Sequence, residues 1–99
     1  MTTLEKLQVW YYNQCNDDWE HGNGIKIDTI DNPGWSIKID LIETDLENKK
    51  FKRIEVERTD YDWFHCWVKD NTFEVACGVH NLQEALEIFL NWAEQDCSS

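Results

Sequence analysis

The stretch WFHCWVKDNTFEVACG, at residues 63–78, restricts the fold more than any other part of the sequence. Because side chains alternate between the two faces of a strand, a turn at Asp70-Asn71 predicts a β-hairpin with one apolar face. Its facing pairs of apolar or thiol side chains are Val68 with Phe73, Cys66 with Val75, and Phe64 with Cys77. The opposite face of the first strand carries Trp63, His65 and Trp67.

Three more runs with a period of two residues precede this hairpin. The runs GIKIDTI (24–30) and WSIKIDLI (35–42) flank the turn signal DNPG and predict another hairpin. Its apolar rows share a face only if the connection has three residues or a strand contains a bulge, so the register stays open. KRIEVER (52–58) predicts a further strand, with Ile54 and Val56 pointing inward and the charged residues outward.

Helical patterns lie at both ends of the chain. TTLEKLQVWYYNQC (2–15) has capping-box spacing at Thr2 and Glu5. Its apolar stripe at helical period comprises Leu4, Leu7, Tyr11 and Cys15. NLQEALEIFLNWAEQ (81–95) has Asn81 as N-cap, with Glu84 three residues later. The core stripe of this second helix comprises Leu82, Ala85, Leu86, Phe89, Leu90 and Ala93.

The order helix, five strands, helix (αβββββα) predicts an α+β fold. A five-stranded antiparallel sheet, with the N-terminal and C-terminal helices packed on one of its faces, would bury the apolar rows of all elements. With 99 residues, the chain is expected to form a single domain over residues 1–99. The segments at residues 16–24, 43–50 and 59–62 are expected to be loops.

Charge and cysteine content limit the class of function. The formal net charge is −11, from 20 acidic and 9 basic residues, so binding to nucleic acid is not expected. An acidic surface attracts basic partners, although acidity can also serve solubility alone. No long apolar run is present, so we expect no membrane association. The four cysteines, Cys15, Cys66, Cys77 and Cys97, form no CxxC motif, and we expect a cytoplasmic protein with reduced thiols.

The stretch DDWEHGNG (17–24) places a tryptophan and a histidine among three carboxylates. Histidine and carboxylates together can bind a divalent metal. Adjacent residues in a loop do not converge on a metal without other ligands, however, and no zinc or calcium motif supports them. We therefore expect an acidic loop pinned by Trp19, with Trp19, Glu20 and His21 contacting a protein partner and no metal or other cofactor bound.

A small hydrolase or a sulfur-handling enzyme is the alternative function. Glu55 and Glu57 share one strand face, but an acid–base pair needs a cleft in which the two pKa values differ. Cys66 and Cys77 lie on apolar strand faces, and neither precedes the arginine that an anion-cradling cysteine loop requires. His65 neighbours Cys66 in sequence yet points to the opposite face. No residue is assigned a catalytic role, and we do not expect an enzyme.

The ring side chains of Trp63, His65 and Trp67 share the strand face that is directed away from the helices. An exposed apolar patch rimmed by acidic residues, here Asp60 and Asp62, is typical of a protein-binding surface. Three alternatives stay open for this patch. The charged segment 43–50 covers it, a second copy of the chain covers it in a homodimer, or it binds a small molecule.

The stretches DDWEHGNGIKIDTIDNPGWSIKIDL, IEVERTDYDWFHCWV and NLQEALEIFLNWA resemble the immunity protein 53 family of bacterial polymorphic toxin systems. The resemblance covers about Leu7 to Ala93, and its most specific parts are Trp19-Glu20-His21 with Gly24, the run at residues 31–35, and Asp62-Trp63. Members of that family are small cytosolic proteins encoded beside a toxin gene. The resemblance implies that this chain binds and neutralises a cognate toxin, and it brings no catalytic residues with it.

The charge adds an expectation about the toxin. A nuclease must attract phosphate and therefore has a basic active site, which an acidic inhibitor can occlude. A deaminase or another enzyme with a basic cleft fits equally well. We expect carboxylates to pair with Lys or Arg of the toxin and tryptophans to fill pockets. The expected contact residues are Trp19, Glu20, His21, Asp60, Asp62, Trp63, His65 and Trp67.

Overall fold

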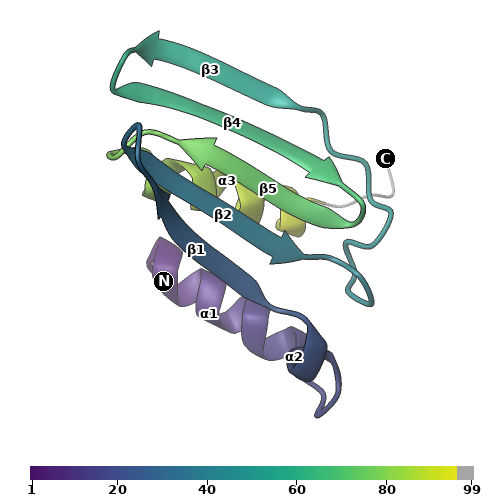
Figure 1. Ribbon diagram of the computed structural model, residues 1–99. Coiled ribbons are helices and arrows are strands. Elements are labelled where there is room, and N and C mark those ends of the chain that lie inside the picture. The colour runs from purple at the N-terminus through teal and green to yellow at the C-terminus, as the bar shows by residue number, and fades with distance from the viewer. Residues whose placement is uncertain (96–99) are drawn as a thin grey trace.

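The computed structural model describes residues 1–95, in which three helices and five strands form (Figure 1). In chain order the elements are α1 (Thr3–Gln14), α2 (Trp19–Gly22), β1 (Ile25–Ile30), β2 (Gly34–Asp40), β3 (Ile54–Thr59), β4 (Asp62–Lys69), β5 (Thr72–Cys77) and α3 (Leu82–Glu94). A five-stranded antiparallel sheet with a helix at each end of the chain confirms the predicted α+β class. None of the helices described is long and apolar enough to cross a membrane.

β5 is the central strand of the sheet, whose order is β1-β2-β5-β4-β3 with antiparallel neighbours throughout. Asp70 and Asn71 join β4 to β5 with φ values of 53° and 57°, as a two-residue type I′ turn requires. The facing pairs are Phe64 with Cys77, Cys66 with Val75, and Val68 with Phe73. The predicted hairpin and its register are therefore confirmed.

The first hairpin joins β1 to β2 through the three residues 31–33. Ile27 pairs with Ile37, so the apolar rows of the two strands lie on the same face of the sheet. Of the alternatives that the sequence leaves open, the three-residue connection is the one formed. Gly34 follows it at a point where any side chain would meet the backbone oxygen of Cys77.

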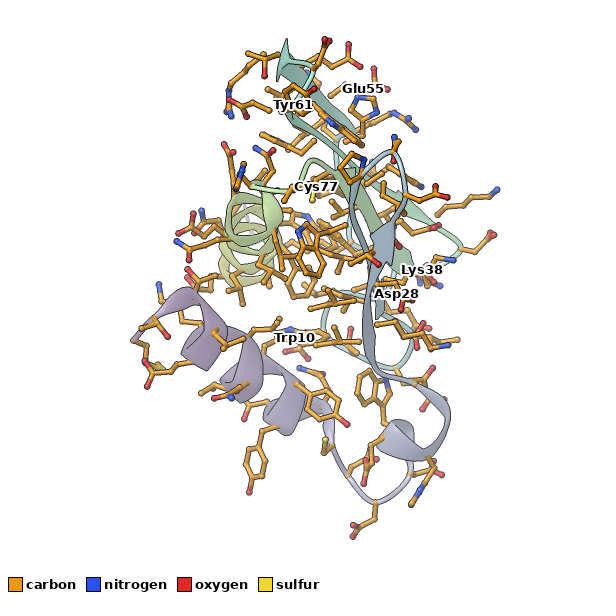
Figure 2. All side chains as sticks on the ribbon, turned by 60° about the vertical axis from the view of Figure 1, so that its left-hand side comes forward. Trp10, Asp28, Lys38, Glu55, Tyr61 and Cys77 are labelled. Atoms are coloured by element: carbon orange, nitrogen blue, oxygen red, sulfur yellow. The ribbon has the colours of Figure 1, made fainter. Side chains whose placement is uncertain are left out.

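The core lies between the sheet and the two longer helices, α1 and α3, which lie on the same face (Figure 1). In Figure 2, Trp10 and Cys77 lie on this helix side of the sheet, whereas Lys38 and Asp28 lie on the other side, which we call the outer face. The largest fully buried side chains are Trp19, Phe73, Phe89, Ile37, Ile39, Leu41, Cys66 and Cys77. The helices from the two ends of the chain therefore close one core together.

The stripe predicted for α1 is only partly buried. Leu7 is in the core, and Trp10 packs against it with its ring centroid 5.0 Å from that of Phe89. Leu4 is 59% exposed and Tyr11 is 37% exposed. The prediction is wrong at these two positions because one side of α1 extends beyond the sheet that was expected to cover it.

The two helix starts differ in how well the sequence predicted them. The capping box of α1 is confirmed, because Thr2 Oγ1 accepts from Glu5 N at 3.1 Å while Glu5 Oε1 accepts from Thr2 N at 2.9 Å. At α3 the N-cap residue is Asn81, as predicted, but its side chain makes no capping hydrogen bond. Its Nδ2 instead donates to Asp62 Oδ1 at 2.9 Å and to Glu84 Oε1 at 3.2 Å.

The apolar stripe of α3 is confirmed, with Ala85, Leu86, Phe89 and Leu90 buried and Leu82 and Ala93 packed against the core. Trp92 is also buried, which the helical period did not indicate, and its Nε1 donates to Lys50 O at 2.9 Å. Lys49 Nζ donates to the carbonyl oxygens of Trp92 and Gln95 at 2.7 and 2.8 Å. The segment 43–50 therefore runs to the end of α3 on the helix side, with Leu46 in the core.

Truncating the centre of the core should destabilise the fold. Phe73 is 0% exposed, and its ring centroid lies 5.1 Å from those of Phe51 and Phe89. We expect Phe73→Ala to lower the free energy of unfolding, measured by urea denaturation, by about 3–5 kcal/mol. Tyr61→Ala removes a ring that is 72% exposed, and it should change stability by less than about 0.5 kcal/mol. Equal effects of the two variants would contradict this description of the core.

Candidate functional site

The first predicted contact segment, at residues 16–24, contains the short helix α2 in place of the expected loop. Trp19 begins α2 and is only 1% exposed. Its Nε1 donates to Ile42 O at 2.8 Å, and its ring packs edge-on against Trp10 at 6.3 Å between centroids. Trp19 therefore pins the segment to the core. The expectation that it also contacts a partner directly is incompatible with this burial.

Glu20 uses its carboxylate to shape the same segment. Its Oε1 accepts from Asn16 N at 2.9 Å, and its Oε2 accepts from Asp17 N at 2.8 Å. Hydrogen bonds from the backbone N–H of Glu20 itself and from that of Asn16 lower the pKa of the carboxyl group. The bond from Asp17 N to Glu20 Oε2 helps to hold the backbone of Asp17, whose φ of 71° is unusual for a residue with a side chain. The exposed side chains in the segment 16–24 are those of Asn16, Asp17, Asp18 and His21.

The second predicted segment brings three ring side chains together on the outer face of β4. Trp63, His65 and Trp67 are half-buried there, and we call them the aromatic patch. The rings of Trp63 and His65 pack edge to face with centroids 5.6 Å apart. The guanidinium of Arg53 lies 5.1 Å from the centre of the Trp67 ring, and His65 Nε2 lies 3.1 Å from Glu57 Oε1. Residues from the β3 side therefore brace the patch.

No element within residues 1–95 lies over the aromatic patch. Both longer helices are on the other face of the sheet, and residues 43–50 turn toward the end of α3 (Figure 1). Cover by the segment 43–50, one of the open alternatives, is therefore wrong. Cross-strand neighbours of the patch include Glu55 on β3, opposite His65, and Glu74 on β5, opposite Trp67. Carboxylates therefore flank the patch, together with Arg53, whose Nε pairs with Glu55 Oε2 at 2.6 Å.

The carboxylate of Asp62, at the start of β4, belongs to a network of polar side chains. Its Oδ1 accepts from Asn81 Nδ2 and from Arg58 Nη1, both at 2.9 Å, and Arg58 Nη2 binds Glu84 Oε2 at 2.8 Å. The bond from Asn81, followed by that from Arg58, lowers the pKa of Asp62, and Arg58 lowers that of Glu84. The carboxylate of Asp62 is therefore already bound by groups of the same chain. Asp60, in the preceding turn, is exposed.

The buried amide of Asn81 also fixes the position of Trp63. Asn81 is 4% exposed, and its Oδ1 accepts from Trp63 N at 3.2 Å. Gly78 N donates to Trp63 O at 2.9 Å. A Cβ atom on Gly78 would lie 2.7 Å from Tyr61 O and 2.9 Å from Asn81 Oδ1, so a side chain there would displace the groups that hold Trp63.

A surface pocket of about 500 Å³ opens beside Trp63, lined by Asn32, Glu57, Arg58, Thr59, Asp60 and Trp63. Asn32 comes from the β1–β2 connection, which lies at the same end of the sheet as the β3–β4 turn (Figure 1). Asn32, Glu57 and Arg53 were not among the residues expected at the site. The alternation of side chains in KRIEVER predicted that Arg53 and Glu57 lie on the surface. Which ring side chains they contact follows only from the β3–β4 register.

The two predicted contact segments do not meet. Figure 1 shows α2 beside the beginning of β1, whereas the β3–β4 turn lies at the opposite end of the sheet. The strand order also puts β1 and β3 at opposite edges. A partner that touches both segments must therefore reach across the outer face.

The alternative of a hydrolase or sulfur-handling enzyme gains no support from the site. Burial raises the pKa of Cys66 to about 12 and that of Cys77 to about 11, which disfavours the reactive thiolate. His65 meets Glu57 on an open strand face, where the Glu57 side chain is 72% exposed, and not in a closed pocket. No group of three or more potential metal ligands occurs in residues 1–95. Cys97 lies outside the described residues.

Comparison with protein families matches residues 4–94 to the family described as immunity protein 53. The matched range extends the resemblance seen in the sequence by three residues at its N-terminal end and by one at its C-terminal end. Comparisons with curated proteins and with solved structures find no match to the chain.

Removing Arg58 should change how stability depends on pH. The lowered pKa values of Asp62 and Glu84 contribute stability that is present above the unfolded-state values and is lost as pH falls through the folded-state values. We expect the free energy of unfolding to fall between about pH 5 and about pH 3, and to fall less in Arg58→Gln than in the wild type. Urea denaturation at several pH values measures both slopes.

Lys52→Gln is the matched control, because it removes one positive charge at an exposed position that makes no ion pair in the described structure. It should keep the wild-type slope. A wild-type slope in Arg58→Gln would show that the network does not hold these carboxylates in the ionised state.

Proposed function

The chain belongs to the immunity protein 53 family, and we propose that it is an immunity protein that binds and neutralises a cognate bacterial toxin. It acts in the cytosol of the producing cell. Neutralisation comes from occluding the toxin and not from a reaction that this chain catalyses. Membership of the family supports a toxin partner. The aromatic patch supports the outer face of the sheet as the surface that binds it.

The observation that carries this proposal is the aromatic patch on a sheet face that no element within residues 1–95 covers. Tryptophan is among the residues that contribute most to binding energy at protein interfaces. Trp63 is fixed by Asn81 and Gly78, and Trp67 lies under Arg53. Side chains that are already held in place lose little conformational entropy on binding. The patch is therefore preorganised for contact with another protein.

The net charge of −11 supports a basic partner. Opposite charges on two proteins accelerate their encounter and orient it. A nuclease domain is the toxin class we propose, because its phosphate-binding cleft is basic. Glu57 and Glu74 beside the patch would then face Lys or Arg of the toxin while the tryptophans fill apolar pockets.

We propose different roles for the contact residues, based on their burial and hydrogen bonds. Asp60, Trp63, His65 and Trp67 are available to touch the partner directly on the outer face and its end. In the segment 16–24, exposed His21 can do the same. Buried Trp19 acts only by holding that segment in place, and the carboxylates of Glu20 and Asp62 serve mainly as acceptors within the chain.

Charge reversal at Asp60 should slow association with the toxin. Asp60 is exposed at the rim of the patch and makes no ion pair within residues 1–95. We expect Asp60→Lys to lower the association rate constant about threefold to tenfold at low salt, and less at high salt, because screening weakens steering. Stopped-flow mixing with the toxin domain encoded beside this chain measures that rate. Glu47→Lys makes the same charge change at an exposed position on the segment that runs to α3, and it should have the smaller effect.

Truncation of Trp67 should weaken the complex itself. We expect Trp67→Ala to raise the Kd for the toxin domain by about 30-fold, which corresponds to about 2 kcal/mol at an interface hot spot. Inhibition of the toxin should then require proportionately more protein. Calorimetry measures the Kd, and circular dichroism checks the fold. Val9→Ala truncates an apolar side chain that is 44% exposed on α1, away from the patch, and provides the control. An unchanged Kd in a folded Trp67→Ala protein would remove the patch from the interface.

A further inference from the structure

β1 forms one edge of the sheet, and its outward backbone groups have no partner within residues 1–95. Gly24 O accepts from Asp40 N at 3.0 Å, which marks this facing pair as hydrogen-bonded. Because hydrogen-bonded and non-hydrogen-bonded pairs alternate along an antiparallel ladder, the N–H and C=O groups of Ile25, Ile27 and Thr29 point away from β2. These three residues present a row of donors and acceptors to any strand that lies alongside.

The two edges of the sheet differ in how they are protected. At the β3 edge the register with β4 shifts between Glu57 and Thr59, and such an irregularity disfavours pairing with another strand. β1 pairs with β2 through all six of its residues without a shift, and it contains no proline. Ile27 on this edge is 39% exposed. A regular edge with an exposed apolar residue is the kind that accepts a further strand.

α1 gives that edge an apolar floor. Figure 1 shows α1 running alongside β1 on the helix side and projecting past the free edge of the strand. Leu7, Gln8 and Tyr11 of α1 and Ile25 of β1 line one side of a pocket of about 590 Å³, whose other side is formed by residues 20–24. Leu4, one helical turn before Gln8, lies on the same side of α1 and is 59% exposed. A strand added beside β1 would cover these side chains.

We propose that the toxin contributes an extended segment that pairs with β1 as a sixth strand and packs on α1. This inference rests on the proposed function, because it names the form in which the toxin engages this chain. The segment has apolar side chains on the face directed toward Leu4, Tyr11 and Ile27. Its backbone completes the hydrogen bonds that Ile25, Ile27 and Thr29 leave open.

The charges around the groove indicate that the added segment is basic. Asp40 and Lys26 line the pocket at the beginning of β1, and exposed Asp28 lies in the middle of the strand. Asp31 follows its end, whereas Lys26 is the one basic residue within it. Lys or Arg in the toxin segment would therefore meet mainly carboxylates. The same complementarity is proposed for the outer face, so one basic protein can satisfy both.

A second copy of this chain fits the edge poorly. In a symmetric pair joined through β1, each α1 would lie beneath the β1 strand of the other copy. Neighbouring strands are about 4.8 Å apart, whereas packed helices need about 8–10 Å between their axes. The two α1 helices would therefore collide. A partner that brings an extended segment without a helix on that side avoids this collision.

Amide hydrogen exchange tests the proposal directly. The probe is the toxin domain encoded beside this chain, in a 1:1 complex with the full-length protein. In the free protein the N–H groups of Ile25, Ile27 and Thr29 should exchange rapidly, because they lack partners. In the complex we expect their exchange to slow at least about tenfold, as ladder hydrogen bonds would require. The inward N–H groups of Lys26 and Asp28 serve as an internal reference for β1.

Substitutions on the groove provide a second measurement. Ile27→Lys puts a charge on the face that the added strand would cover, and Leu4→Glu puts one on the floor. Each should raise the Kd for the toxin domain at least about tenfold. Val9→Glu introduces the same charge on α1 at a position 44% exposed on another side of the helix, and its Kd should stay within about twofold of the wild type.

The outcomes separate this inference from the proposed function. If the toxin domain binds and is inhibited while exchange at Ile25, Ile27 and Thr29 is unchanged, the added strand is wrong and the immunity function stands. If the toxin domain does not bind at all, both are wrong. Concentration-dependent protection of the same amides in the free protein would show that a second copy occupies the edge, which also overturns the proposal.

Discussion

The fold depends on the central strand β5, whose inward side chains must be removed from water on one face only. Phe73, Val75 and Cys77 are buried on that face, whereas Glu74 and Ala76 alternate with them on the outer face. Strands on both sides repeat this alternation, so the sheet requires cover on a single side. α1 and α3 supply that cover, and the outer face needs none for the core to form. It is therefore free to serve recognition.

Sequence reasoning succeeded where neighbouring residues determine the outcome. The β4–β5 register followed from a two-residue turn, and the three facing apolar pairs agree with it. It failed where the burial of a residue depends on elements that are distant in the sequence. The exposure of Leu4 depends on where α1 lies relative to the edge of the sheet, and the burial of Trp19 depends on an acceptor at Ile42 O. The spacing of apolar residues within one segment predicts neither the exposure of Leu4 nor the burial of Trp19.

The candidate site shows the same division between local and distant information. The shared face of Trp63, His65 and Trp67 follows from strand alternation alone. That Arg53 lies over Trp67 requires the β3–β4 register, and the register shift between Glu57 and Thr59 follows no apolar pattern. Asn81 had the spacing of a helix cap, yet its amide joins α3 to the start of β4 because Asp62 and Trp63 N offer competing partners. Polar networks of this kind are specified by three-dimensional proximity, which spacing in one segment does not contain.

The aromatic patch and the β1 edge are compatible with a single partner because of the dimensions of the sheet. Five strands about 4.8 Å apart place the two edges roughly 19 Å from each other. A protein interface of standard size covers roughly 800 Å² on each side, which is wide enough to extend across that distance. Between the two regions the outer face carries Lys38 opposite Glu74, and Ser36 opposite Ala76. No helix or loop of the described residues lies between patch and edge on this face, so a partner bound at the patch could reach β1 without displacing an element of the fold.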